Sequence, residues 1–137
     1  MRFLHLSDLH LGKRVCEFSM LEDQRYILEE ILNLLDEQPV NGVLLAGDLY
    51  DKPVPPAEAV RLLDWFLTQL AAQGLPVFAI SGNHDSADRI AFGAALLQQS
   101  QVYVSPVFTG APEAIPLTDE TGTVDVYLLP FLKPATV

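Results

Sequence analysis

The chain has 137 residues, of which 50% are hydrophobic and 19% charged, which suits one globular domain with a buried core. Its formal net charge of -10 excludes a surface that attracts nucleic acid or anionic membranes everywhere, although bound cations can create a local site for phosphate. Cys16 is the single cysteine, which excludes an intrachain disulfide and fits a cytoplasmic location. We expect neither a signal peptide nor a membrane span, since no apolar run approaches the ~18 residues that a span needs.

The first third of the chain predicts a strand, a helix and a second strand. Residues 2–6 form a short apolar run, and residues 20–37 carry apolar side chains at helical spacing. Ser19 and Glu22 have the spacing of a capping box at the start of that helix. Residues 43–46 are uniformly apolar, which is typical of a parallel strand covered on both faces.

The same alternation continues through the middle of the chain. A second helix is predicted from Pro56, a favourable first residue, to a cap at Gly74. A strand at residues 77–80 follows, and then a third helix with Ser86 as its N-cap. Residues 102–104 predict a fourth short strand.

Strands that alternate with helices predict an α/β fold with a mostly parallel sheet, flanking helices and right-handed crossovers. Alternating patterns at 113–117 and 124–128, with Gly122 between them, predict a C-terminal β-hairpin. In parallel sheets of this kind, ligands bind outside the carboxyl ends of the strands.

Polar clusters follow each of the first three predicted strands and therefore meet at that edge. Their side chains are carboxylates, imidazoles and a carboxamide. The clusters are Asp8 with His10, Asp48 with Asp51, and Asn83 with His84 and Asp85. We expect one site built from three strand ends.

Oxygen and imidazole donors without a thiolate suit Mn, Fe or Zn. The expected metal ligands are Asp8, His10, Asp48 and Asn83. Asp48 is the candidate bridge between two ions, which could clamp the attacking and leaving oxygens of a phosphoryl displacement. His84 is left to bind a phosphate oxygen or protonate the leaving oxygen, while Asp51 and Asp85 orient the ligands.

Simpler interpretations exist for single residues. Taken alone, Asp8, Asp48 and Asp85 would each be read as turn or cap residues, and only their coincidence at three strand ends argues otherwise. His5 lies inside an apolar strand, so we expect a hydrogen-bonded core histidine. Trp65 is expected in the core or in an interface.

The three clusters read D-x-H, G-D-x-x-D and G-N-H-D in order, and this set resembles the calcineurin-like metallophosphoesterases. The longer stretches HLSDLHLGK, LLAGDLYDKPVPP, SGNHDSADRIAFG and LLPFLKP resemble the SbcD family, the nuclease subunits of bacterial SbcCD complexes. The resemblance covers nearly the whole chain.

This resemblance implies a metallophosphoesterase-type sandwich that binds two divalent metal ions, Mn foremost. It implies a DNA exonuclease and endonuclease that cleaves phosphodiester bonds in double-strand-break processing. Asp8 and His10 would hold the first ion, Asp48 would bridge, Asn83 would hold the second and His84 would be the catalytic histidine. The implied partners are DNA, an SbcC-like ATPase with a long coiled coil, and a second copy bound through the second or third helix.

The chain departs from the family pattern in its histidines. The family completes its metal sites with further histidines downstream, including a G-H-x-H-like motif, whereas this chain has only His5, His10 and His84. Residues 1–137 are therefore predicted to be the N-terminal part of such a nuclease domain, incomplete at the C-terminus. We expect one bound ion or none, and little activity from this chain alone.

Two other functions remain open from the residues. One is another metallophosphoesterase, either a phosphatase or a small-molecule phosphodiesterase. The other is a non-catalytic fragment that folds and dimerises.

Overall fold

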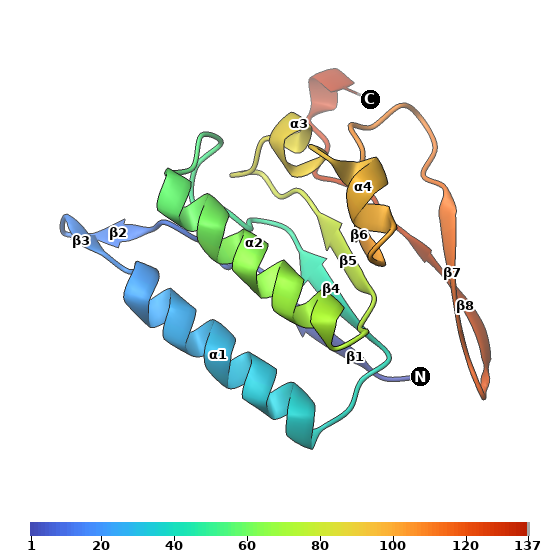
Figure 1. Ribbon diagram of the computed structural model, residues 1–137. Coiled ribbons are helices and arrows are strands. Elements are labelled where there is room, and N and C mark those ends of the chain that lie inside the picture. The colour runs from blue at the N-terminus through green and yellow to red at the C-terminus, as the bar shows by residue number, and fades with distance from the viewer. Residues whose placement is uncertain (137) are drawn as a thin grey trace.

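A computed structural model describes residues 1–136 and shows an α/β fold with a hairpin appended (Figure 1). The core elements, in chain order, are β1 Phe3–Leu6, α1 Leu21–Glu37, β4 Gly42–Ala46, α2 Ala57–Ala72, β5 Val77–Ile80 and β6 Val102–Val104. The additional elements are β2 Arg14–Val15, β3 Phe18–Ser19, α3 Ala87–Ile90, α4 Ala94–Gln98, β7 Ala114–Asp119, β8 Gly122–Tyr127 and the 3-10 turn Pro134–Thr136.

The central sheet has the strand order β1-β4-β5-β6, and all of its neighbouring strands pair in parallel. Helices α1 and α2 lie side by side over one face of this sheet (Figure 1). Each connects two adjacent strands, so all strands point toward the same edge. The predicted fold class is confirmed.

The main core lies between the sheet and these two helices. Val43, Leu45 and Val77 point toward α2, where Phe66 and Leu70 are fully buried. Burial of each such side chain stabilises the fold by about 1.5–3 kcal/mol. In the part of the chain that the structure describes, no helix is long and apolar enough to cross a membrane.

Trp65 lies on α2 at the contact with α1, which confirms the prediction of a core or interface position. Its side chain is partly buried and packs against the core cluster. The Arg25 guanidinium of α1 stands 4.3 Å from the centroid of its ring. This cation–π contact joins the two long helices.

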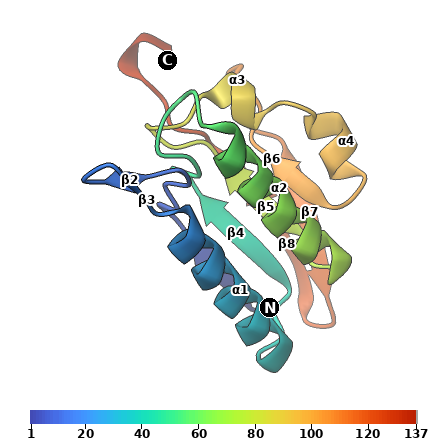
Figure 2. The same cartoon turned by 60° about the vertical axis from the view of Figure 1, so that its left-hand side comes forward.

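The second face of the sheet is covered less completely. Phe78 is buried there and its ring stacks on Tyr103, with 5.3 Å between the centroids. In the view of Figure 2, α1 and α2 stand in front of the sheet and the β7–β8 hairpin lies behind it. On this face Leu44 keeps partial exposure, so only one face of β4 is fully buried.

His5 also points to the second face, and its predicted core position is wrong. Its side chain is exposed, whereas the neighbouring Leu4 and Leu6 pack against the helix-side core. Alternate residues of a strand face opposite sides of a sheet, and His5 falls on the side that the helices leave uncovered.

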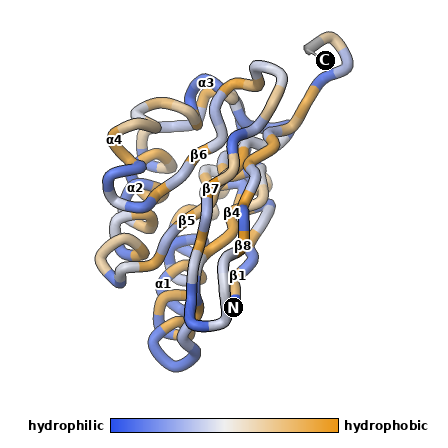
Figure 3. The backbone as a smooth tube through the Cα atoms, turned by 90° about the vertical axis from the view of Figure 1, so that its right-hand side faces the viewer, coloured by the Kyte–Doolittle hydropathy of each residue, from blue (hydrophilic) through white to orange (hydrophobic). Residues whose placement is uncertain are grey.

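The predicted C-terminal hairpin is present, but it begins one residue later and ends one residue earlier than predicted. Both strands extend two residues further toward the turn, so Gly122 begins β8 instead of lying between the strands. Its tip is hydrophilic and lies near the N-terminus (Figure 3). There the amino group of Met1 lies 3.3 Å from Asp119 Oδ2. This ion pair fixes the hairpin at the end of the sheet opposite to the strands' carboxyl ends.

Three local predictions differ from the structure. Ser19 and Glu22 form no capping box, because Met20 is the N-cap of α1 and no side chain caps that helix. The third predicted helix is split into α3 and α4 at Gly93, whose φ of 71° is left-handed. The small β2–β3 hairpin between β1 and α1 is not predicted at all.

Candidate metal centre

The loops that follow β1, β4 and β5 meet at the carboxyl edge of the sheet, where the sequence predicts a site. The first two loops run alongside each other: the Asp8 N–H donates to the Gly47 carbonyl at 3.1 Å, and the His10 N–H donates to the Asp48 carbonyl at 2.9 Å. The strand pairing thus extends into the loops and holds the polar side chains in register.

The backbone is strained at three of the predicted metal ligands. Asp8, His10 and Asp48 have φ angles of 57°, 45° and 50°. Residues other than glycine and asparagine rarely adopt this left-handed region, and each instance costs of order 1 kcal/mol or more. Three of the six non-glycine residues with positive φ in the described part of the chain are these candidate ligands, and such strain occurs at functional sites, where the surrounding structure holds side chains in one orientation.

Asp8, His10 and Asp48 converge on one point. His10 Nε2 lies 3.8 Å from Asp8 Oδ1 and 3.8 Å from Asp48 Oδ2. The three donor atoms lie within 4.8 Å of one another, and Asp48 is buried. Two bonds of about 2.1 Å to one ion leave ligand atoms roughly 3–4 Å apart, so this donor set fits a divalent metal.

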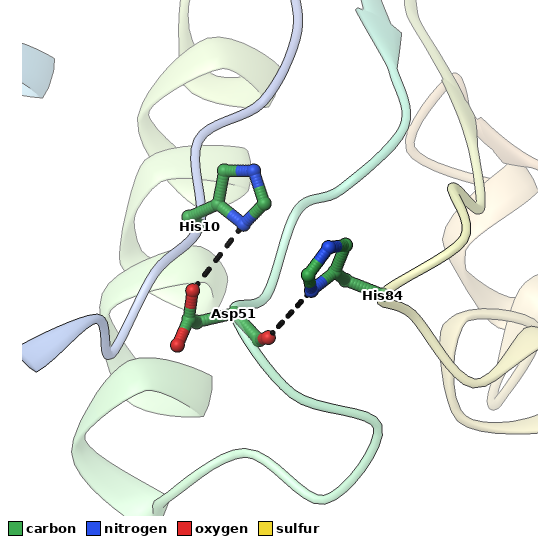
Figure 4. Close-up of side chains that lie close together, drawn as sticks. All are labelled: His10, Asp51 and His84. Carbon is green, nitrogen blue, oxygen red and sulfur yellow. Dashed lines mark hydrogen bonds and ion pairs between the residues drawn. The ribbon is translucent and has the colours of Figure 1, made fainter.

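The other nitrogen of His10 faces Asp51. His10 Nδ1 is buried and lies 3.4 Å from Asp51 Oδ1, close enough for an ion pair but without an aligned hydrogen bond (Figure 4). A carboxylate behind a histidine is the arrangement that orients metal-binding imidazoles in proteins. A second possible donor group consists of His10, Asp51 and His84. We favour the first group, because there Asp51 supports the ring from behind.

His84 is held by two residues of the loop after β4. Its Nδ1 lies 3.1 Å from the Asp51 backbone carbonyl, and its backbone N–H donates to Asp48 Oδ1 at 2.9 Å. A carbonyl oxygen only accepts, so Nδ1 carries the proton and Nε2 is left for other partners. The His84 ring meets the His10 ring edge to face at 4.9 Å (Figure 4 shows both rings).

Asp85 binds the loops together. Its Oδ2 accepts hydrogen bonds from the N–H groups of Leu49 and Gly82, and its Oδ1 accepts one from Tyr50. Burial, followed by the nearby carboxylates of Asp85 and Asp64, raises the pKa of the Tyr50 phenol to about 12. Asp85 therefore acts on the site through the backbone that carries Asp48.

Gly82 allows the closest approach between the β4 and β5 loops. A Cβ atom there would stand 2.1 Å from Asp48 Oδ1 and 2.3 Å from the Asp48 nitrogen. Gly47 in turn packs against Gly82 and has a φ of 90°. Gly47 and Gly82, which precede the second and third polar clusters, are thus required by the contact between these two clusters.

Asn83 completes the set of sequence-predicted residues. Its exposed side chain lines a cavity of about 280 Å³ together with Asp8 and Asp48. The site residues predicted from the sequence are therefore brought to one edge of the sheet. Asp51 lies behind the His10 ring, and Asp85 holds the loops after β4 and β5 through their backbone N–H groups.

Two contributors to the site were not found from the sequence. The Asp51 backbone carbonyl orients His84, and no residue pattern marks a carbonyl. The segment from Leu129 to Phe131 lines the cavity although it lies 44 or more residues beyond Asp85, the last residue of the polar clusters. The stretch LLPFLKP carries part of the family resemblance, but no polar side chain in this segment marks it as part of a site.

Asp8, His10 and Asp48 therefore form, at the carboxyl edge of the sheet, a donor group suited to a divalent metal ion. Residues 1–130 match the calcineurin-like phosphoesterase family, and the chain belongs to that family. The family resemblance expected from the three motifs is confirmed at this level.

Proposed function

We propose that this chain is part of an SbcD-like nuclease that hydrolyses phosphodiester bonds of DNA, and that its activity alone is low. The observation that carries the catalytic part is the position of His10, between Asp8 and Asp48 on one side and Asp51 on the other. Asp8, His10, Asp48 and Asn83 would hold divalent metal, Mn in the first place. Bound metal would supply a nucleophilic water at neutral pH and neutralise charge on the phosphate.

The roles of the chain's own residues follow from their contacts. Asp48 is fixed by the His84 N–H at one oxygen, which leaves the other oxygen directed at His10 Nε2. His84 is fixed at Nδ1. In its imidazolium form, with both ring nitrogens protonated, its Nε2 would give a proton to the leaving oxygen when the P–O bond breaks, and the ring would keep the proton on Nδ1. Asp51 serves both histidines, one through its carboxylate and one through its carbonyl.

Basic residues follow several of the strands that lead to the site. Five of the eight Lys and Arg residues lie in the segments after β1, β4, β5 and β8, among the acidic residues that form the site: Lys13, Arg14, Lys52, Arg89 and Lys133. These basic residues would contact DNA phosphates, while the net negative charge of the chain limits non-specific binding.

The partners of this function are proposals as well. An SbcC-like ATPase with a coiled coil would bind the chain, and failure of such an ATPase to associate with the purified chain would count against this. A second copy would bind through the region of α2 to α4. Phe92 and Leu96, which are 84% and 73% exposed, support this part of the proposal.

The test combines Mn²⁺ calorimetry with hydrolysis of an oligonucleotide by the full chain. Asp48→Asn should abolish Mn²⁺ binding and cleavage together. His84→Ala should keep Mn²⁺ binding and lower cleavage by about 10²–10⁴-fold, because it removes only the proton donor. Asp125→Asn, an exposed carboxylate on β8, is the matched control and should change neither quantity.

A substrate panel separates this proposal from the other enzymes of the family. Cleavage of the oligonucleotide above the His84→Ala background supports the nuclease. Turnover of a phosphopeptide or a phosphomonoester alone would favour a phosphatase. Equal turnover by the wild type and His84→Ala on every substrate would overturn the catalytic proposal for this chain.

A further inference from the structure

Apolar side chains form part of the wall of the cavity that contains the candidate metal centre. Leu129, Pro130 and Phe131 line it together with Asp8, Asp48 and Asn83. A site for a bare phosphate ion needs charged and polar groups alone. The apolar wall therefore calls for a ligand that carries an apolar group next to its phosphate.

The wall is held rigidly against the end of β5. Leu128 and Pro130 are buried, and the Phe131 N–H donates to the Ser81 carbonyl at 2.9 Å. Ser81 is itself buried and donates through its own N–H to the Ser105 hydroxyl at 3.3 Å. The segment is thus anchored by side chains and by backbone before any ligand binds.

Its residues alternate between buried and exposed positions. Leu128 and Pro130 point inward, whereas Leu129 and Phe131 are 49% and 50% exposed. In an extended segment, alternate side chains project to the same side. Leu129 and Phe131 therefore present a preformed apolar surface at the cavity, with half of each side chain still open to contact.

The size and chemistry of this cavity fit a nucleotide better than phosphate alone. Its volume of about 280 Å³ is near the lower end for small-molecule sites. A phosphate placed among Asp8, His10 and Asp48 by a metal ion would extend its esterified group into the rest of that space. Aromatic rings stack on every nucleobase regardless of sequence, which suits a nuclease that cleaves many sequences.

We propose that Phe131, supported by Leu129, is the subsite for the nucleoside attached to the scissile phosphate. The inference rests on the proposed function and adds to it a specificity-determining contact. In this proposal, contacts with the apolar wall distinguish a phosphodiester of DNA from inorganic phosphate, and the metal ligands do not.

The test measures binding to the full chain in the presence of Mn²⁺, with thymidine 5′-monophosphate and inorganic phosphate as the two probes. Phe131→Ala should raise the Kd of the nucleotide about tenfold, because it removes one stacking contact, and leave that of phosphate unchanged. Phe131→Tyr keeps the ring and should restore nucleotide binding. Phe18→Ala is the matched control, because Phe18 lies on β3, is 76% exposed and does not line the cavity.

The outcomes separate this inference from the proposed function. Equal Kd values for nucleotide and phosphate in the wild type, or no loss of nucleotide affinity in Phe131→Ala, would overturn the subsite. An unchanged Mn²⁺ affinity in Phe131→Ala is expected either way, since the side chain is no ligand. Absence of Mn²⁺ binding in the wild type would instead contradict the metal centre itself.

Discussion

Gly82 is the residue on which the geometry of the site depends most directly. It lies so close to Asp48 that no Cβ atom fits between them, and the contact is with the Asp48 backbone as well as its carboxylate. A flexible side chain could move aside, but a backbone nitrogen held in the loop cannot. Gly82 thus fixes the distance between the β4 and β5 loops.

Gly82→Ala should therefore lower the free energy of unfolding by about 3 kcal/mol and weaken Mn²⁺ binding, because the two loops must separate. Gly74→Ala is the matched control. Gly74 also has a positive φ, but a Cβ there would meet open space, so its cost should be about 1 kcal/mol with no effect on the metal. Denaturant unfolding and Mn²⁺ calorimetry measure both quantities. A Gly82→Ala protein that binds Mn²⁺ like the wild type would contradict this account of the site.

At the same scale, the meeting of the candidate site residues at one edge of the sheet could be predicted from the sequence, because each follows a short apolar run and a turn. Their roles as metal ligands stay a prediction. Asp8, Asp48 and Asn83 come at the ends of three strands, and parallel pairing brings such ends together. His5 was predicted wrongly because a strand pattern does not reveal which face the helices cover. The position of Phe131 at the cavity depends on a contact with Ser81, 50 positions away, which no local pattern encodes.

At the scale of elements, the loops after β4 and β5 are joined through one carboxylate. Asp85 accepts three backbone N–H groups, from Leu49, Tyr50 and Gly82. These donors would otherwise be left without partners in a part of the structure that is largely buried. A hydrogen bond to a charged group contributes about 1.5–3 kcal/mol, so this carboxylate does much to hold the two loops together.

Asp85→Asn should lower the free energy of unfolding by about 2–4 kcal/mol. The side-chain NH₂ group of asparagine would face backbone N–H groups, which are donors as well. Its single side-chain oxygen cannot accept hydrogen bonds from all three backbone N–H groups. Chemical denaturation followed by circular dichroism gives the change, with Asp125→Asn expected within about 0.5 kcal/mol of the wild type. Equal stability of the two variants would show that Asp85 does not hold the loops.

The regular elements were predictable where their signals are long. Helices α1 and α2 have 17 and 16 residues with clear apolar faces, and their positions were predicted within one or two residues. Shorter elements were not. The β2–β3 hairpin has two residues per strand, and its turn places Cys16 and Glu17 at positive φ, which neither residue type favours. Gly93 adopts a left-handed conformation that splits the third helix, and the neighbouring sequence does not predict this.

At the scale of the whole molecule, the two ends of the sheet have different characters. The carboxyl edge carries the candidate metal centre, and at the opposite end the N-terminal amino group pairs with Asp119. Hydrogen bonds from the side chain and backbone of Thr121 lower the pKa of Asp119, which keeps the carboxylate charged for this contact.

The proposed homodimer also belongs to this scale. Phe92 and Leu96 are four residues apart in the α3–α4 region and are largely exposed. A two-fold interface would bring each pair against its copy, which removes two large apolar side chains per chain from water. A stable dimer buries about 800 Å² per partner, so neighbouring residues of α2 would have to contribute as well.

Leu96→Glu should convert this dimer to a monomer, because two carboxylates would face each other across the two-fold axis without a partner. Light scattering or sedimentation at about 50 μM chain gives the mass directly. Leu34→Glu on α1 is the matched control, since Leu34 is also an exposed leucine but lies outside α2–α4, and it should leave the mass of a dimer unchanged. A monomeric wild type would contradict the proposed dimer. A dimer that survives Leu96→Glu but not Leu34→Glu would place the contact on α1 instead. Mn²⁺ binding should be the same in both variants, because neither leucine lines the cavity at the metal centre.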